Sequence, residues 1–526
     1  MTGALKLLLL ILRRDRLLAP LWIIPLALLP AGYAASINEL YPTAAARQSY
    51  ADASAAMGGL TALYGPVYGS GLGELTAWRA GFIPVIIALL TILTVIRHTR
   101  TEEEAGRREL IGATVVGRHA GLAAALLAAI TTTTACGALT TLVMIGQNLP
   151  ATGSLALGAQ FAATGWIFAA VGGVAAQLTQ SAGTARGIAI AALGAAYLLR
   201  VAGELGTEAL TWASPLGWIT MTRPYADNRW WTITLAAALT AALTALAVHL
   251  SARRDVGAGL LPDRLGPATA APTLRSPLAL AWRLHRALLT AWIAGFAAIG
   301  AVLGGIADGM SRLTGDNQQL HDMMARIGGT DAIADAYFAS MATLLGLAAA
   351  GYAVQATLRL RAEETGLRAE PVLTASVSRT RWAAGHLAFS LLGTAAVLTT
   401  GGAATGLAHG LTTGDLAHQL GRVTGAALVQ LPAAWVLAAV TVALTGLLPR
   451  LAAAAWGVLA LCLVINLVGA LAQLDERVMD ISPFTHLPKV PAAPVTTAPL
   501  LWLTALAAVL TATGLYGLRR RDIPVT

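Results

Sequence analysis

The chain has 526 residues, of which 56% are apolar and only 12% are charged, and its mean hydropathy is +0.67. Soluble domains carry about 25% charged residues, so this composition excludes a soluble globular protein, a disordered chain and an ordinary nucleic-acid-binding domain. A helix needs about 20 apolar residues to cross a bilayer, which leaves room for about twelve such helices. We therefore expect an all-α polytopic membrane protein.

Apolar runs of that length fall into two series of six. The first series covers residues 17–36, 80–96, 120–146, 158–178, 187–203 and 231–250. The second series covers residues 284–306, 337–357, 383–408, 423–447, 451–472 and 499–517. Cys136 and Cys462 lie inside these runs, which predicts small core residues rather than a disulfide or a metal site.

An amphipathic segment, residues 4–14, precedes the first run, and a similar segment, residues 278–286, precedes the seventh. An apolar face with basic residues beside it favours a helix that lies in the membrane interface. We expect an interfacial helix at both places. The alternative is that each segment simply extends the membrane helix that follows it.

Matching residues recur in the same order in the two series, which indicates a tandem duplication. The matches join Arg13, Arg16, Trp22 and Ile23 to Arg283, Arg286, Trp292 and Ile293, Gly58-Gly59 to Gly328-Gly329, and Ser214-Pro215-Leu216 to Ser482-Pro483-Phe484. The sequence thus predicts two tandem six-helix repeats, residues 1–255 and 282–526. The Pro-rich stretch 256–281 is predicted to be a cytoplasmic linker between them.

The basic residues are unevenly distributed along the chain. If the N-terminus is inside, most of the 35 basic residues fall in cytoplasmic segments, as the positive-inside rule requires. Both termini are then predicted to be cytoplasmic. The formal net charge of +9 becomes a signal of membrane topology, and no nucleic-acid partner is needed to explain it.

The sequence lacks the motif of an ATP-binding protein. It contains no GxxxxGK[ST] phosphate loop, and its only lysines are Lys6 and Lys489. It also lacks an HExxH motif and a clustered set of Cys and His. We expect no catalytic residue, metal site or cofactor in this chain.

Two charged loops, residues 97–118 and 359–381, are the strongest functional signal. Each contains an acidic pair followed by a glycine. Helical spacing predicts that Glu104 lies above Arg108 on a short helix parallel to the membrane, a form suited to docking on another protein. A solvated basic loop is the alternative, but it leaves the repeated acidic pair unexplained.

At these loops, in the S-P-[LF] segments and in the fused six-plus-six layout, the chain resembles the permeases of type 2 ABC exporters. Within them it is similar to bacterial exporters of polyketide antibiotics, including tetronasin-resistance permeases. The resemblance implies a permease of the bacterial plasma membrane that exports lipophilic antibiotics or drugs. It also implies that the loops are coupling helices, which dock onto two copies of a separately encoded ABC ATPase subunit that binds ATP and Mg.

The resemblance transfers a coupling role to five residues in each loop. These residues are Glu103, Glu104, Gly106, Arg108 and Glu109 in the first loop and Glu363, Glu364, Gly366, Arg368 and Glu370 in the second. The second loop has Pro371 where the first has Leu110. This proline is expected to end the second helix early.

Aromatic residues are dense between residues 204 and 231, which is typical of a membrane-interface belt. The resemblance implies that this segment and its counterpart help to close the external exit; simple anchoring is the alternative. The implied gate residues are Trp212, Pro215, Trp218, Pro483 and Phe484.

Every acidic residue is placed in a loop or at the end of a predicted span. A transporter driven by protons or sodium usually needs a buried carboxylate, so this placement favours ATP hydrolysed by a partner and a neutral, lipophilic substrate. In related permeases the second and fifth spans of each half face the central cavity. That implies the candidate lining residues Thr91, Thr94, Tyr197, Tyr352 and Asn466, for which hydrogen bonds between helices are the alternative.

A secondary drug transporter of the major-facilitator type is the main alternative, because it also has six plus six spans and a basic loop after the second span. However, the chain lacks the G-x3-D-R-x-G-R-[KR] pattern of that loop and has a long first external loop in each half. A third possibility is a scaffold or sensor subunit of an ABC complex that does not itself transport.

Overall fold

The computed structural model describes residues 2–112, 114–261, 268–315, 330–375, 377–468 and 475–522, without the side chains of 110–112, 308–315, 330–333 and 467–468. Over these ranges the secondary structure is entirely helical. Within the same ranges, twelve helical segments are long and apolar enough to cross a membrane. The prediction of an all-α polytopic membrane protein with about twelve spans is confirmed.

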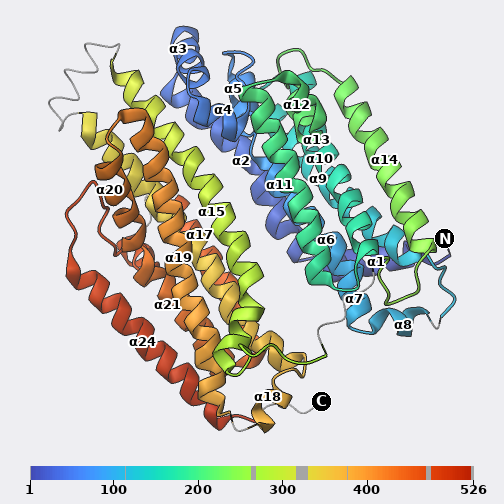
Figure 1. Cartoon of the computed structure of the whole chain (residues 1–526). Coiled ribbons are helices and arrows are strands. Elements are labelled where there is room, and N and C mark those ends of the chain that lie inside the picture. Colours follow the sequence, from blue (N-terminus) through green and yellow to red (C-terminus); the bar gives the residue numbers. More distant parts are fainter. Residues whose placement is uncertain are drawn as a thin grey trace. The chain divides into compact units, whose positions relative to one another are not determined.

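The chain divides into two compact units, Met1–Gly266 and Pro267–Thr526 (Figure 1). Unit 1 contains the first six spans. They are α2 (Leu18–Leu40), α6 (Ile83–His98) continued by α7 (Arg100–Glu104), α9 (Ala120–Gly146), α10 (Ala151–Leu178), α11 (Ala182–Leu205) and α14 (Trp231–Ala252).

Unit 2 contains the other six spans. They are α15 (Pro277–Gly315), α17 (Thr330–Thr365), α19 (Arg379–Thr413), α20 (Leu416–Val429) with α21 (Leu431–Leu447), the 3-10 helix η1 (Pro449–Ala454) with α22 (Ala455–Val468), and α24 (Thr497–Arg520). The tenth span is interrupted at Gln430 because Pro432, in the first turn of α21, has no backbone N–H to continue the helix. Helix α15 begins at Pro277, within the stretch assigned to the linker from the sequence.

The two ends of unit 1 carry different short helices (Figure 1). Helices α1 (Ala4–Arg14), α7 and α8 (Arg107–Gly112) lie at one end. The opposite end carries five short helices. They are α3 (Ala44–Ala55), α4 (Gly58–Tyr64), α5 (Leu72–Arg79), α12 (Glu208–Ala213) and α13 (Pro215–Thr220). Among the described residues of unit 2, the short helices are α18 (Glu370–Thr374) and α23 (Glu476–Met479).

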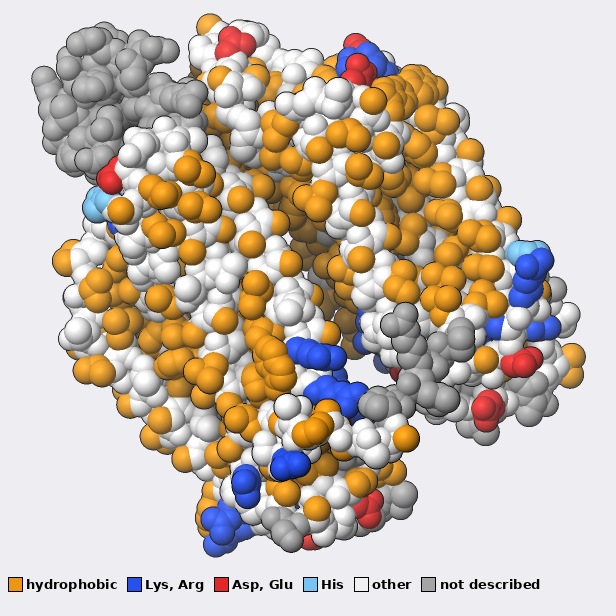
Figure 2. All heavy atoms as spheres, in the orientation of Figure 1, with side chains coloured by type: hydrophobic (Ala, Val, Ile, Leu, Met, Phe, Trp, Pro, Cys, Tyr) orange, Lys and Arg blue, Asp and Glu red, His pale blue; other side chains and the backbone are white. Residues whose placement is uncertain are grey.

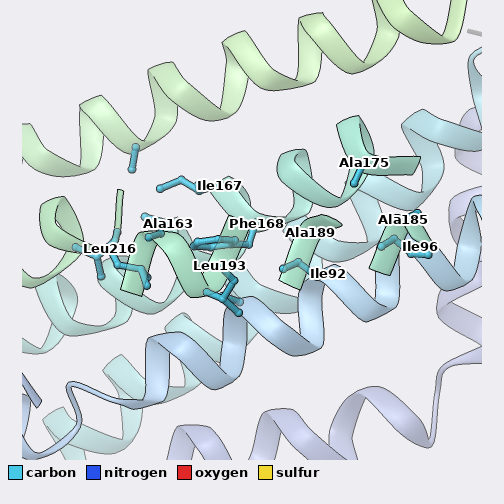
Figure 3. Close-up of a cluster of buried hydrophobic side chains, with 14 of the residues drawn as sticks. Ile92, Ile96, Ala163, Ile167, Phe168, Ala175, Ala185, Ala189, Leu193 and Leu216 are labelled. Atoms are coloured by element: carbon cyan, nitrogen blue, oxygen red, sulfur yellow. The ribbon is translucent and has the colours of Figure 1, made fainter. Parts of the chain in front are cut away.

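Helix α10 is the core of unit 1. Buried residues on α10, including Ile167 and Phe168, pack against Ile92 and Ile96 of α6 and Leu193 of α11 (Figure 3). Outward-facing side chains are also apolar, and Figure 2 shows largely apolar helix flanks with charged side chains gathered toward the helix ends. A surface of this kind suits contact with lipid, where the backbone is already satisfied within each helix.

A separate helix precedes the first span at the N-terminus, whereas the separate helix predicted at 278–286 is wrong. Helix α1 is separated from α2 by a turn that contains Asp15. The Asp15 carboxylate accepts a hydrogen bond from His98 Nε2 at 2.6 Å and lies 3.2 Å from Arg97 Nη1. In unit 2, α15 runs unbroken through 278–286, where His285 instead meets His386 of α19 at 2.9 Å.

Helices α9 and α10 approach each other closely at two glycines. A Cβ atom placed on Gly137 would lie 2.2 Å from the carbonyl oxygen of Gly158. Backbone cannot move aside as a flexible side chain does, so we expect Gly137→Ala to lower the free energy of unfolding by about 1–3 kcal/mol. The measurement is the thermal unfolding midpoint of the purified chain in detergent.

Gly194, in the middle of α11, is the matched control, because a Cβ atom there meets no heavy atom within 4 Å. Gly194→Ala should leave the midpoint unchanged or raise it, since alanine favours helix over glycine by about 0.5–1 kcal/mol. Equal effects of the two substitutions would contradict the close approach of α9 and α10.

Candidate functional site

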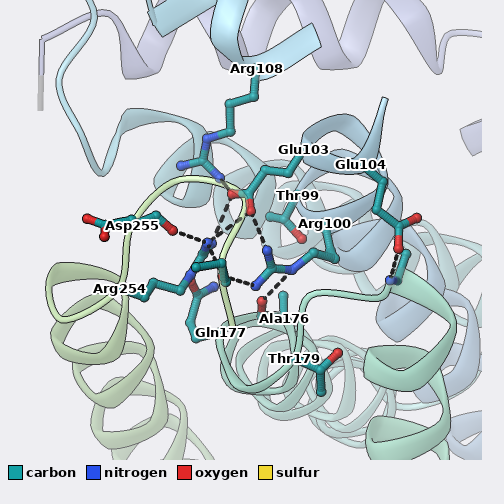
Figure 4. Close-up of polar contacts among 12 residues, drawn as sticks. Thr99, Arg100, Glu103, Glu104, Arg108, Ala176, Gln177, Thr179, Arg254 and Asp255 are labelled. Atoms are coloured by element: carbon teal, nitrogen blue, oxygen red, sulfur yellow. Dashed lines mark hydrogen bonds and ion pairs between the residues drawn. The ribbon is translucent and has the colours of Figure 1, made fainter. Parts of the chain in front are cut away.

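The first charged loop is built around the carboxylate of Glu103, at the end of the second span. Its side chain is only 1% exposed. Arg100 Nη1 donates to Oε2 at 2.7 Å, and Arg254 donates to both carboxylate oxygens at 2.9 and 3.0 Å (Figure 4). Arg108 from α8 also pairs with Oε1. We call Glu103 with these three arginines the first cluster.

The first cluster joins the ends of three spans. Arg100 also donates to the carbonyl of Ala176, at the end of the fourth span, at 3.0 Å. Arg254 donates to Gln177 Oε1 at 2.8 Å and lies just after the sixth span. Since Arg100 and Glu103 belong to the second span, one carboxylate fixes the second, fourth and sixth spans together at this end of unit 1.

Burial lowers the pKa of Arg108 from its ordinary value; Glu103 opposes this shift and Arg254 adds to it. The guanidinium still carries its charge at neutral pH, because an arginine pKa starts above 12. The positions of the three guanidinium groups depend on the buried carboxylate, because an uncompensated buried charge is strongly unfavourable.

The predicted stacking of Glu104 on Arg108 is wrong. Helix α7 ends at Glu104 because Gly106 adopts a left-handed conformation with φ +68°, so the two side chains do not share one helix. Glu104 Oε1 instead accepts from the backbone N–H of Ala182 at 2.5 Å, in the first turn of the fifth span. A carboxylate is favourable at a helix N-terminus.

Helix α8 and helix α1 are connected through Glu102. Arg107 Nε donates to its carboxylate at 2.6 Å, and Arg14 of α1 donates at 2.7 Å. Because these side chains are partly exposed, the contacts contribute little stability individually. They do place the interfacial helix beside the charged loop.

Unit 2 has a second cluster at the end of its second span, formed by Glu363 and Glu364 in the last turn of α17. Both are buried, with 4% and 1% of the residue exposed. Arg359 and Arg368 donate to Glu363 at 2.7 and 2.9 Å. Arg521, just after the sixth span of the unit, reaches both oxygens of Glu364 at 2.5 Å.

The two units therefore repeat one arrangement with different acids. In each unit a buried glutamate at the end of the second span binds an arginine that follows the sixth span. Glu103 binds Arg254 in unit 1, whereas Glu364 binds Arg521 in unit 2. The two arginines were missed in the sequence, although each is a basic residue directly after the last apolar run of its half.

The residue that ends the helix with a left-handed conformation differs between the two loops. Helix α17 ends in a Schellman motif in which Leu367, with φ +55°, donates to the carbonyl of Glu364 and Arg368 donates to that of Glu363, both at 3.0 Å. The expected effect of Pro371 is wrong, because the helix has already ended at Thr365. Pro371 lies in the first turn of α18, where a proline is well tolerated.

The ten predicted coupling residues fall into two sets that differ in their exposure to solvent. Glu103, Glu363 and Glu364 are buried in the clusters, and Gly106 and Arg108 are half-buried. The exposed members are Glu104, Glu109, Gly366, Arg368 and Glu370. Arg108 and the buried glutamates hold the loops to their bundles. The second set is accessible to solvent, although Glu104 and Arg368 also make contacts within their units.

The predicted gate residues lie in segments that are bound to the fifth span in both units. In unit 1, Ser214 caps α13, which begins with Pro215, and its hydroxyl donates to the carbonyl of Ala196 at 2.6 Å. In unit 2, Asn466 donates to the hydroxyl of Ser482 at 2.8 Å.

The aromatic members of the gate set pack inside their own units. Trp218 Nε1 donates to the carbonyl of Trp212 at 2.7 Å, and Trp212 stacks on Trp231 with ring centroids 5.3 Å apart. Phe484, after Pro483, is buried in the core of unit 2. The contacts hold each S-P segment against the fifth span of its own unit.

The predicted cavity residues use their polar groups inside their own units. The hydroxyls of Thr91 and Thr94 donate to the carbonyls one turn earlier in α6, at 2.6 and 2.8 Å. Tyr197 donates to Ala62 at 3.0 Å and Tyr352 to Phe389 at 2.8 Å. The structure thus shows intramolecular hydrogen bonds for all of them, including Asn466.

The fold and the clusters define a helical membrane protein built from two six-span units, each with a charged loop fixed to its span ends. The chain is 47% identical over 523 residues to the multidrug efflux system permease protein Rv1217c of Mycobacterium tuberculosis (strain ATCC 25618 / H37Rv), covering 99% of this chain and 95% of that protein. Residues 274–519 match the family model of the C-terminal domain of the multidrug efflux system permease Rv1217c. The chain belongs to this family of multidrug efflux permeases.

Glu103→Gln tests the first cluster. The substitution preserves shape but leaves three guanidinium groups around a neutral amide, so we expect the free energy of unfolding to fall by about 3–5 kcal/mol. Chemical unfolding of the purified chain in mixed micelles measures it. Glu109→Gln, at an exposed position of α8, should have no comparable effect; a similar loss for both would refute the special role of the buried carboxylate.

Proposed function

We propose that the chain is the membrane subunit of an ATP-driven ABC efflux pump of the bacterial plasma membrane, exporting lipophilic antibiotics or drugs. Two copies of a separately encoded ABC ATPase subunit bind the two charged loops, and ATP and Mg are bound by those subunits. Both termini and both loops face the cytoplasm, as the distribution of basic residues favours. Membership of the multidrug efflux permease family supports the export role.

The observation that carries the proposal is the link between each loop and the span ends of its unit. A partner that moves α8 displaces Arg108, and with it the carboxylate that holds the second, fourth and sixth spans of unit 1. In unit 2, movement of Arg368 acts through Glu363 on the last turn of the second span, where Glu364 binds Arg521. A solvated loop without such contacts would absorb the movement.

Two kinds of residue follow from this division of roles. The exposed residues Glu104, Glu109, Arg368 and Glu370 contact the ATPase, and the buried glutamates transmit its movement to the spans. The polyketide-antibiotic exporter subgroup indicated by the sequence stays a prediction.

The substrate path is proposed from the same architecture. The second and fifth spans, which carry Thr91, Thr94, Tyr197, Tyr352 and Asn466, line it, and the S-P segments with Trp212, Trp218 and Phe484 close its outer end. Because the polar groups of the five lining candidates already have partners, they offer the substrate mainly apolar contact. This is consistent with a lipophilic compound.

The energy source is tested by reconstituting the chain in liposomes with and without the ABC ATPase subunit of its source organism. We expect drug transport only when both proteins and ATP are present, because the chain carries no phosphate loop. Transport of a fluorescent drug is the readout, with ionophores added to collapse ion gradients. Proton-dependent transport by the chain alone would establish the major-facilitator alternative.

Docking is tested by reversing the exposed charges Glu109 and Glu370 to lysine together. Because both side chains are exposed, we expect normal folding but at least about tenfold weaker binding of the ATPase, measured by co-purification and by biolayer interferometry. The matched control reverses Glu39 and Glu476, which are also exposed but lie away from the charged loops. Unchanged binding in the first variant would remove the docking assignment.

A further inference from the structure

Unit 1 contains a cavity of about 460 Å³ beside the first cluster. Its apolar wall is the inner face of α1, with Leu7, Leu10 and Ile11. The opposite side is formed by the loop before α9 and by the residues that follow the sixth span. Ligand sites typically have volumes of about 300–1,000 Å³, so the cavity is large enough to hold a small ligand or the head of a larger one.

Most of the charged groups around this cavity are already paired. Arg14 binds Glu102 at 2.7 Å, Arg108 binds Glu103, and His98 binds Asp15. These pairs line the cavity without offering it a net charge. Two lining groups of opposite charge have no ion-pair partner among the described residues.

Arg118 and Asp255 are the two groups that remain. The Arg118 guanidinium donates to a backbone carbonyl, that of Arg254, at 2.8 Å, and has no acidic partner among the described residues. The Asp255 carboxylate has neither an ion pair nor a hydrogen bond within the described part of the chain, and Figure 4 shows its side chain directed away from the first cluster. Both residues line the cavity, which therefore presents one unpaired cation and one unpaired anion.

The depth of the cavity places it at the membrane interface. It is lined by His98, the last residue of α6, and by Gly121 and Ala124 in the first turns of α9. The outer face of α1 is strongly apolar, with Leu5 and Leu9 68% and 60% exposed. Such a helix lies among headgroups and upper acyl chains, which puts the cavity beside it at headgroup depth.

We propose that this cavity binds the headgroup of a membrane phospholipid that carries a primary amine, of the phosphatidylethanolamine class. The phosphate binds Arg118 and the ammonium binds Asp255, while the acyl chains lie along Leu7, Leu10 and Ile11 of α1. A purely anionic headgroup leaves the Asp255 carboxylate facing another negative charge. A choline headgroup has no N–H to donate to it.

One site per chain is expected. The cavity needs an interfacial helix that turns away from the first span, and α1 is such a helix. In unit 2 the corresponding segment is part of the continuous helix α15. The inference concerns lipid binding alone and does not depend on the proposed pump.

The test is native mass spectrometry of the full chain in detergent, titrated with phosphatidylethanolamine, phosphatidylglycerol, phosphatidylcholine and free phosphoethanolamine. We expect one bound phosphatidylethanolamine, with at least about tenfold preference over the other two lipids, as one charge-assisted contact provides. Free phosphoethanolamine, which lacks acyl chains, should compete only weakly. Equal binding of the three lipids, or equal competition by the free headgroup, would overturn the proposal.

Two substitutions separate the roles of the charges. Asp255→Asn should remove the preference for phosphatidylethanolamine over phosphatidylglycerol, and Arg118→Gln should weaken both lipids. Arg253→Gln is the matched control, because Arg253 is exposed beside these residues but does not line the cavity. All three side chains are exposed to solvent, so none of the substitutions should change the unfolding midpoint. An unchanged midpoint then verifies that each variant is folded. Unaltered lipid preference in Asp255→Asn would refute the assignment of the ammonium.

Discussion

The architecture of both units depends on burying a carboxylate at the end of the second span. A charged group there cannot leave water without a counter-ion, so arginines must converge on it from other elements. In unit 1 they come from the second span, from α8 and from Arg254 after the sixth span. The requirement to neutralise Glu103 thus fixes which span ends meet, and it positions the exposed loop that follows.

The two units satisfy this requirement differently, which shows how a duplication diverges while the constraint persists. Unit 1 gathers its arginines on Glu103 and uses Glu104 to cap the fifth span. Unit 2 divides its arginines between Glu363 and Glu364 and turns the chain at Leu367 instead of at a glycine. The arginine after the sixth span is common to both. The two units thus share this contact in addition to the acidic pair of the loop sequence.

Much of the fold could be predicted from the sequence, because twelve apolar runs and the bilayer thickness set the number of spans. The acidic pairs also identified the charged loops. Their contacts could not be predicted, because helical spacing assumes one continuous helix, whereas Gly106 and Leu367 end the helices within the loops. Arg254 and Arg521 were hidden for another reason: after a membrane span, a basic residue is expected from topology alone.

Burial also changes what a charged loop can be used for. A partner can bind only side chains that it can reach, and three of the four glutamates in the repeated acidic pairs, Glu103, Glu363 and Glu364, are buried. Repetition of the acidic pair is therefore explained by the need to hold the span ends of each unit together. The same reasoning applies at the neighbouring cavity, where the paired arginines are committed to the fold and only Arg118 and Asp255 remain for a ligand.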